Sequence, residues 1–193
     1  MGINYAAINA KIAGKRTVLA GDGALITRWL PHGHVRAFIS NMASAPGYTR
    51  DVAQYIKLWQ QARQLKGTNG RVAQAILGTE IDLRNILWLY RLKKYRGVAG
   101  DEAFGKLIPV RWRLTMAWWQ RMASAANGTA LLDAIASSPY GGVFSSFTQP
   151  ERALDAAVAR MCGIEAKRNP NSIAGLCGFI LRVPASPYLV PAW

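Results

Sequence analysis

The sequence predicts an all-α protein built from multi-helix lobes. Three observations support this: apolar residues recur at spacings of three and four along most of the chain, no segment alternates as a strand does, and one segment carries signals for both ends of a helix. Hydrophobic residues make up 51% and charged residues 18% of the 193 residues, which is too apolar for a disordered chain. A chain of this length buries about 70% of its unfolded surface, so a conventional core is expected.

The first part of the chain is expected to hold short helices and one clearer one. The apolar spacing predicts short helices over residues 3–13, 24–30 and 34–43. A clearer helix is expected over 51–65, where one face is apolar. Gly67, Asn69 and Gly70 are expected to close it. Residues 72–77 then lead into the next helix.

The helix predicted from Thr79 to Arg96 carries the most information. Thr79 is the expected N-cap, while Glu80 and Asp82 place negative charge where the helix dipole favours it. Three cations crowd the opposite end: Lys93, Lys94 and Arg96. Gly97 follows as the expected stop. Apolar residues leave almost no polar face between these ends, so we expect neighbours to enclose this helix on all sides.

The second half of the chain is expected to hold further helices and an irregular tail. Apolar spacing and bordering prolines predict the helices over residues 114–125, 129–136, 150–167 and 172–181. Prolines at positions 184, 187 and 191 exclude a regular helix in the segment that follows residue 181. The chain is therefore divided into a first helical lobe (1–100), a second, incomplete lobe (101–181) and a Pro-rich tail (182–193).

An internal pseudo-repeat supports the division into lobes. Ser44–Tyr48 reads Ser-Ala-Pro-Gly-Tyr and Ser137–Gly141 reads Ser-Ser-Pro-Tyr-Gly, and the two segments start 93 residues apart. Each precedes an amphipathic helix, which indicates two copies of one helical unit. A chance similarity between two turns is the alternative.

The net charge of +14 is the strongest anomaly in the composition. Such a charge favours an anionic partner, and nucleic acid, an anionic bilayer surface and an acidic protein all qualify. A basic solvated surface without a specific partner is the fourth interpretation. The stretch Lys106–Gln120 contains Arg111 and Arg113 but no acid. An aromatic and basic set here could stack on bases or lie at a membrane interface, although such a set is more often half core and half surface. Its members are Trp112, Trp118 and Trp119 with Arg111, Arg113 and Arg121.

Polar residues of the central helix are expected to fix the lobe. Asp82 and Asn85 share a face of a mostly apolar helix, and burial without partners is costly, so a neighbouring segment must supply partners. Arg91 belongs to a stripe in which guanidinium groups can stack on aromatic rings, together with Arg84, Trp88 and Tyr95. The lobe-fixing set is therefore Glu80, Asp82, Asn85 and Arg91. Direct contact with a partner is the alternative for these residues.

A separate set of basic residues is expected to bind a partner. These candidates are Lys93, Lys94, Arg96, Arg111 and Arg113. The first three also suit the end of a helix, where cations are favoured. The two roles are compatible.

No catalytic, metal or cofactor site is expected. His32 and His34 have no acidic or cysteine residue beside them, and Gly14–Thr17 lacks the residues and spacing of a phosphate loop. Cys162 and Cys177 are expected to be small apolar fillers. No uninterrupted apolar run approaches the roughly 20 residues that cross a bilayer.

Several motifs follow one another in a recognisable order. They are Tyr5–Ile12, Tyr55–Trp59, Gly78–Tyr95, Leu107–Pro109 and Arg168–Ala174. The third contains Gly-Thr-Glu-Ile-Asp, then Asn85, Trp88 and Tyr90-Arg91. In order and spacing, these motifs resemble the subunit-d/subunit-C family of rotary V-type and A-type ATPases, in its bacterial form.

The resemblance implies a fold, a function and partners. Members of that family are all-helical and funnel-like, have no active site or cofactor of their own, and lie on the cytoplasmic face of the membrane. They link the central stalk to the membrane rotor ring during proton or sodium transport. We therefore expect a cytoplasmic, peripheral coupling subunit whose partners are stalk and ring subunits.

The C-terminus departs from the family pattern. Full-length members continue through further helices where this chain has Pro-rich sequence, so the resemblance implies a shortened form. The rival interpretation, from another class, is a basic helical nucleic-acid-binding protein. Steeply salt-dependent binding to generic DNA or RNA would favour the rival.

Overall fold

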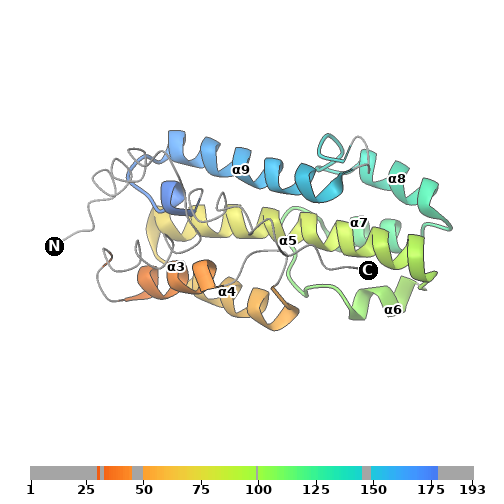
Figure 1. The fold of residues 1–193 in the computed structure, drawn as a ribbon, viewed down its shortest axis with the longest axis horizontal. Helices are drawn as coiled ribbons and strands as arrows, with labels where there is room; N and C mark the ends of the chain where they lie inside the picture. Colours follow the sequence, from red (N-terminus) through yellow and green to blue (C-terminus); the bar gives the residue numbers. More distant parts are fainter. Residues whose placement is uncertain (1–29, 31–32, 45–49, 99, 145–148, 178–193) are drawn as a thin grey trace, which may run out of the picture. The chain divides into compact units, whose positions relative to one another are not determined.

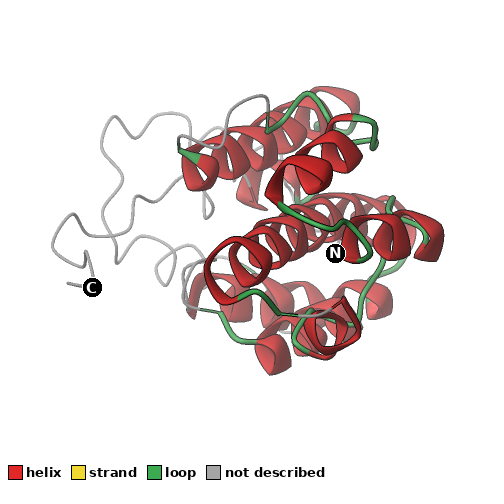
Figure 2. Ribbon diagram, turned by 90° about the vertical axis from the view of Figure 1, so that its right-hand side faces the viewer, coloured by secondary structure: helices red, strands yellow, loops and turns green. Residues whose placement is uncertain are grey.

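The computed structural model describes residue 30 and residues 33–44, 50–98, 100–144 and 149–177. These residues form helices and no strand (Figures 1 and 2), which confirms the all-α prediction. The helices are α3 (His34–Ser44), α4 (Val52–Gln64), α5 (Gly67–Arg96), α6 (Gly100–Gly105), α7 (Met116–Ala123), α8 (Gly128–Ala136) and α9 (Pro150–Arg168). Residues 174–177 are also helical. The helix predicted over 3–13, nearly all of the one over 24–30 and the tail 182–193 lie outside the described residues.

The chain divides into two compact units, which we describe separately. Unit 1 consists of Met1–Ile76 and Ala159–Trp193, and unit 2 of Leu77–Val158. Helices α5 and α9 each contribute residues to both units. This division differs from the sequential lobes 1–100 and 101–181, which stay a prediction about a repeat in the sequence.

Helices α3 and α4 supply much of the described core of unit 1. Asp51 caps α4 through a complete capping box: its carboxylate accepts the amide of Gln54 at 2.7 Å, and the Gln54 side chain accepts the amide of Asp51 at 3.1 Å. The buried residues of the two helices are Phe38, Ile39, Met42, Tyr55, Leu58 and Ala62. The buried amide of Ile173 donates to the side chain of Asn69 at 3.1 Å, which ties a late segment to the first turn of α5.

The predicted start of the central helix is wrong. Helix α5 begins at Gly67 and continues without interruption through Gly78 and Thr79. Thr79, Glu80 and Asp82 therefore lie in the middle of the helix and do not cap it. The helix continues because its apolar face extends upstream of the expected cap, where four residues are buried: Val72, Ala73, Ile76 and Leu77.

The segment after α4 begins the next helix and does not form a loop. A Cβ added to Gly70 would lie 2.1 Å from the carbonyl oxygen of Leu65, so glycine is required for the backbone to turn this closely. Leu65 has extended backbone geometry and ends α4. The glycines interpreted as a stop thus permit a very short connection between α4 and α5.

The far end of α5 follows the prediction only in part. Gly97 has φ +57° and follows the last helical residue, Arg96, so the expected stop is confirmed. From Leu77 to Tyr90 every residue except Trp88 is buried. The last turn and a half is not enclosed, since 70% of Tyr95 is exposed.

Three short helices and a connecting loop complete the described core of unit 2. Thr115 precedes α7 as its N-cap residue, and the Asn127 side chain caps α8 by accepting the amide of Ala130 at 2.9 Å. The large buried apolar residues of this part are Leu107, Ile108, Val110, Leu114, Trp119, Met122, Leu131 and Ile135. The core of unit 2 thus forms around the second half of α5.

Candidate functional site

Asp82 is the centre of the polar contacts in unit 2. Its fully buried carboxylate accepts the backbone amides of Trp112 at 3.2 Å, Arg113 at 2.7 Å and Leu114 at 3.2 Å. Its Oδ2 also accepts the hydroxyl of Tyr140 at 3.0 Å. These amides precede α7 and lie outside any helix, so the carboxylate supplies acceptors that the helical backbone does not.

Burial and hydrogen bonding act in opposite directions on the Asp82 carboxyl. Burial raises the pKa of Asp82 above its ordinary value of 3.8, and the hydrogen bonds from Arg113, Trp112, Tyr140 and Leu114 lower it. Burial also raises the pKa of Tyr140, and the nearby Asp82 charge raises it further. The Tyr140 hydroxyl therefore remains protonated and acts as the donor of the pair.

Asn85 makes a second connection, one turn further along α5. Its Nδ2 donates to the carbonyl of Ile108 at 2.9 Å, and its Oδ1 accepts the amide of Ile108 at 2.8 Å. The side-chain amide of Asn85 thus pairs with both backbone groups of Ile108, as the backbone of a neighbouring strand would. Asn85 and Ile108 are both buried. Asp82 and Asn85 together hold the loop between α6 and α7 at two points.

Gly78 explains how this loop approaches α5 so closely. A Cβ at this position would lie 2.5 Å from Cγ and 2.7 Å from Cδ2 of Trp112. The indole therefore lies directly against the helix backbone, in space that any other residue would fill.

Glu80 and Arg84 are buried charged residues on another part of α5. They are 2% and 6% exposed, respectively. Partial burial raises the pKa of Asp155 on α9, the Arg84 cation lowers it and Glu80 raises it. These three groups therefore interact electrostatically within unit 2. No described residue accepts a hydrogen bond from the Arg84 Nε.

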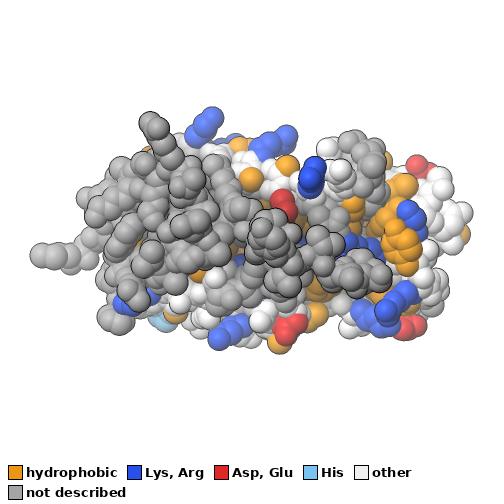
Figure 3. Space-filling model, in the orientation of Figure 1, with side chains coloured by type: hydrophobic (Ala, Val, Ile, Leu, Met, Phe, Trp, Pro, Cys, Tyr) orange, Lys and Arg blue, Asp and Glu red, His pale blue; other side chains and the backbone are white. Residues whose placement is uncertain are grey.

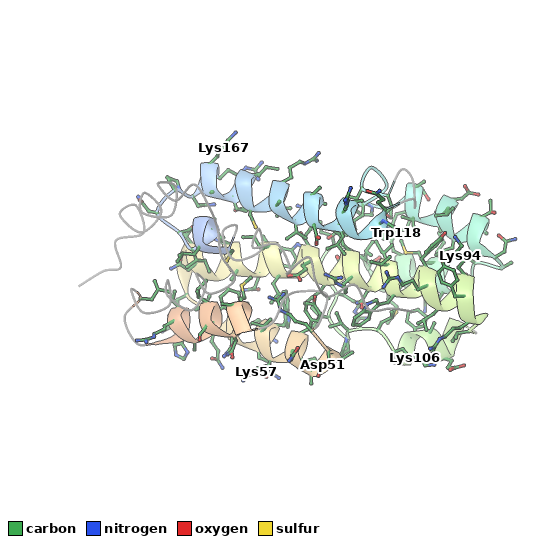
Figure 4. All side chains as sticks on the ribbon, viewed as in Figure 1. Asp51, Lys57, Lys94, Lys106, Trp118 and Lys167 are labelled. Carbon is green, nitrogen blue, oxygen red and sulfur yellow. The ribbon has the colours of Figure 1, made fainter. Side chains whose placement is uncertain are left out.

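The end of α5 holds the first group of predicted partner-binding residues. Lys93 Nζ donates to the carbonyl of Ala125 at 2.8 Å, whereas Lys94 Nζ lies 5.3 Å from the ring centroids of both Tyr90 and Tyr95. Figure 4 labels Lys94 at this end of the helix. Arg96 is exposed.

Arg91 is the remaining member of the predicted lobe-fixing set. Burial lowers the pKa of Arg91 and the Arg84 cation lowers it further, while Tyr95 raises it. Arg91 is therefore close enough to both Arg84 and Tyr95 to be affected by their charges. Lys94 stacks on the ring of Tyr95. This contact was not predicted from the sequence, because Lys94 is not part of the stripe.

The second group, Arg111 and Arg113, lies in the loop that Asp82 holds. Both side chains are exposed, and Arg111 Nη1 approaches Met116 Sδ at 3.7 Å. The loop meets α5 at Asp82, eleven residues before Lys93, which corresponds to about 16 Å along the helix. The five candidate basic residues therefore do not converge on one point.

Comparison with known proteins assigns the family. The family model described as ATP synthase (C/AC39) subunit matches residues 49–183. The chain belongs to the ATP synthase C/AC39 subunit family. This confirms the resemblance to the subunit-d/subunit-C proteins of V/A-type ATPases, and the match covers every residue of the polar contacts described above. No curated protein and no solved structure matches the chain significantly.

Family membership makes the chain a rotary-ATPase subunit. Among its described helices, none combines the length and hydropathy needed to span a bilayer. The lobe-fixing and partner-binding roles of the predicted residues stay predictions, although the structure gives their contacts.

Two features of this C/AC39 chain were missed at the level of sequence. Tyr140 donates to Asp82, and Gly78 accommodates Trp112. A signal existed for Tyr140, since it belongs to the turn Ser137–Gly141 that forms the second copy of the pseudo-repeat. For Gly78, the sequence offers no signal that separates close packing from a helix boundary.

Proposed function

We propose that this chain is a non-catalytic coupling subunit that links the central stalk to the membrane rotor ring of a V/A-type ATPase. It would work on the cytoplasmic face of the membrane, during proton or sodium transport. The family match over residues 49–183 is the observation that carries this proposal.

The geometry of unit 2 is compatible with transmitting force. Helix α5 has 30 residues and is about 45 Å long. Asp82 and Asn85 connect its interior to the loop between α6 and α7 through five hydrogen bonds, and Asp82 accepts a sixth from Tyr140, which follows α8. A coupling element has to keep its internal geometry under load, and buried, satisfied polar contacts favour a single arrangement. We therefore propose lobe-fixing roles for Asp82 and Asn85. For the buried Glu80 and for Arg91, whose side chain is exposed, the same role stays a prediction from the sequence.

The basic residues predicted from the sequence are the proposed contacts to other subunits. They are the half-buried Lys93 and the exposed Lys94, Arg96, Arg111 and Arg113. Rim charges at protein interfaces act mainly on association rate and salt dependence. Lys94 and Arg96 are exposed at the end of α5 and are the most suitable for substitution.

Co-purification tests the proposal. The tagged full chain, co-expressed with the stalk and ring subunits of its source organism, is expected to recover both classes of subunit. The variant Lys94→Gln/Arg96→Gln is expected to recover less, and less still at raised ionic strength, because two charges are lost from the proposed contact. The control Lys57→Gln/Arg63→Gln removes the same charge from exposed positions on α4. Recovery of neither class by the unmodified chain would refute the coupling role.

The net charge of +14 favours one further candidate, a basic nucleic-acid-binding protein. Its affinity for generic DNA would fall steeply with salt, as counterions are released from the phosphates. Tight binding at physiological salt, together with failure to recover rotary-ATPase subunits, would support this second candidate.

A further inference from the structure

The chain contains a long segment without any acidic residue. Between Glu102 and Asp133 there is no Asp or Glu, whereas Lys106, Arg111, Arg113 and Arg121 are present. All four basic residues are exposed. Lys106 forms an ion pair with Glu102, with 2.7 Å between Lys106 Nζ and Glu102 Oε1. The positive charge of Arg111, Arg113 and Arg121 is not offset by acids from the same segment.

Large apolar side chains are exposed among these cations. Trp112 is 37% and Met116 47% exposed, and the half-buried Trp118 lies beside Arg121, whose Cζ is 5.6 Å from the indole centroid. Figure 4 labels Trp118, which lies on α7. Figure 3 shows basic and hydrophobic side chains beside one another on one face of the molecule. We call this set the Arg-Trp surface. Its members are Arg111, Trp112, Arg113, Met116, Trp118 and Arg121.

The backbone that carries this surface is held in place. The amides of residues 112–114 donate to the buried Asp82 carboxylate, and the Trp112 indole lies against Gly78. A surface fixed in this way loses little backbone entropy when it binds.

We propose that the Arg-Trp surface binds the headgroup region of an anionic phospholipid bilayer. Basic residues near such a membrane are attracted by its negative surface potential. Tryptophan is enriched at the membrane interface, and the Met116 side chain gains by leaving water. A bilayer offers the uniform negative charge that these basic side chains complement. The proposal goes beyond the coupling role: it gives Arg111 and Arg113 a lipid partner, and it leaves the contacts with other subunits to Lys93, Lys94 and Arg96.

The same residues fit nucleic acid less well. Base stacking uses the faces of aromatic rings, but one face of Trp112 is covered by α5 and Arg121 lies over Trp118. An exposed Met116 adds nothing to stacking, whereas burial in a headgroup layer removes it from water. Lipid is therefore the proposed ligand, and binding of nucleic acid is one of the outcomes that the experiment distinguishes.

Vesicle flotation with the purified full chain tests the proposal. Binding to vesicles of phosphatidylcholine and phosphatidylserine is expected, with little binding to phosphatidylcholine alone. The variant Arg111→Gln/Arg121→Gln is expected to bind the anionic vesicles about 25-fold more weakly, since each basic residue near the surface contributes about a factor of five. Met116→Ser is expected to weaken binding severalfold without changing its salt dependence.

The matched control is Lys57→Gln/Arg63→Gln, which removes the same charge from exposed positions on α4 (Figure 4 labels Lys57). It is expected to bind as the unmodified chain does, and circular dichroism melting checks that every variant is folded. Three outcomes would overturn the proposal. The chain could bind neutral vesicles as well as anionic ones, or the control could lose as much binding as Arg111→Gln/Arg121→Gln. In the third, a single-stranded oligonucleotide displaces the chain from vesicles and itself needs Arg111 and Arg121 for binding. Because no other subunit is present, the outcome is independent of the co-purification test.

Discussion

At the scale of single residues, Asp82 shows how a buried charge is accommodated. Four donors converge on one carboxylate, and three of them are successive backbone amides. A charged acceptor forms stronger hydrogen bonds than a neutral one, which offsets the cost of its burial. Asp82 therefore organises a loop of unit 2 and does not serve its own helix.

Replacing Asp82 by Asn is expected to destabilise the protein by about 3 kcal/mol. The substituted side chain has one oxygen for four donors, and its NH₂ group faces donors that it cannot pair with. Urea unfolding measures the loss. Asp133→Asn removes an exposed carboxylate on α8 and serves as the control, with an expected change below about 0.5 kcal/mol. Equal effects of the two substitutions would contradict the role given to Asp82.

The stability contribution of Asp82 is expected to depend on pH. Burial raises the pKa of this group above 3.8 in the folded protein, so the folded state binds its proton more tightly than the unfolded state does. The part of its contribution that comes from this pKa shift is fully present below the unfolded pKa and is lost as pH rises through the folded pKa. The hydrogen bonds that it accepts remain at neutral pH. The difference in unfolding free energy between the unmodified chain and Asp82→Asn, followed by urea titrations from acidic to neutral pH, should fall with rising pH. A difference that grows with pH would show that hydrogen bonding outweighs burial.

At the scale of elements, α5 shows where reasoning from local signals fails. Gly78-Thr79 followed by two acids has the composition of a helix start, yet the helix passes through it. The glycine is there because Trp112 occupies the space of its side chain. Burial of the upstream apolar face then outweighs the local preference for a cap.

Replacing Gly78 by Ala separates these two explanations. Helix propensity alone would stabilise α5 by about 1 kcal/mol, but a Cβ at 2.5 Å from Trp112 Cγ forces the indole to move. We expect a net destabilisation of about 1 to 3 kcal/mol in thermal or urea unfolding. The control is Gly163→Ala on α9, where nothing lies within 4 Å of the added Cβ, and where a small stabilisation is expected. Stabilisation by both substitutions would mean that Trp112 does not need this space.

At the scale of the whole molecule, charge and family membership have separate consequences. Membership of the C/AC39 family makes the chain a rotary-ATPase subunit. The charge of +14 is not needed for a helical fold, and part of it gathers on one acid-free segment of unit 2. The co-purification and vesicle experiments address these two properties independently.

Much of this protein followed from its sequence alone. Apolar spacing determined the helical class and the positions of α3, α4 and α9, because a helix that buries one face shows that face in its period. The order of the motifs pointed to the family that the comparison confirmed. Partners for Asp82 and Asn85 were expected, because a buried polar group requires them.

Only the tertiary structure decided who those partners are. Asp82 meets Tyr140, 58 residues away, and Asn85 meets Ile108, 23 residues away. Such pairings depend on how separate segments pack, which local propensity does not encode. For the same reason the sequence predicted a helix boundary at Gly78, whereas the structure shows that the indole of Trp112 lies against this residue. The chain's local signals specify helices, and the contacts between distant segments specify where those helices begin and what their polar residues hold.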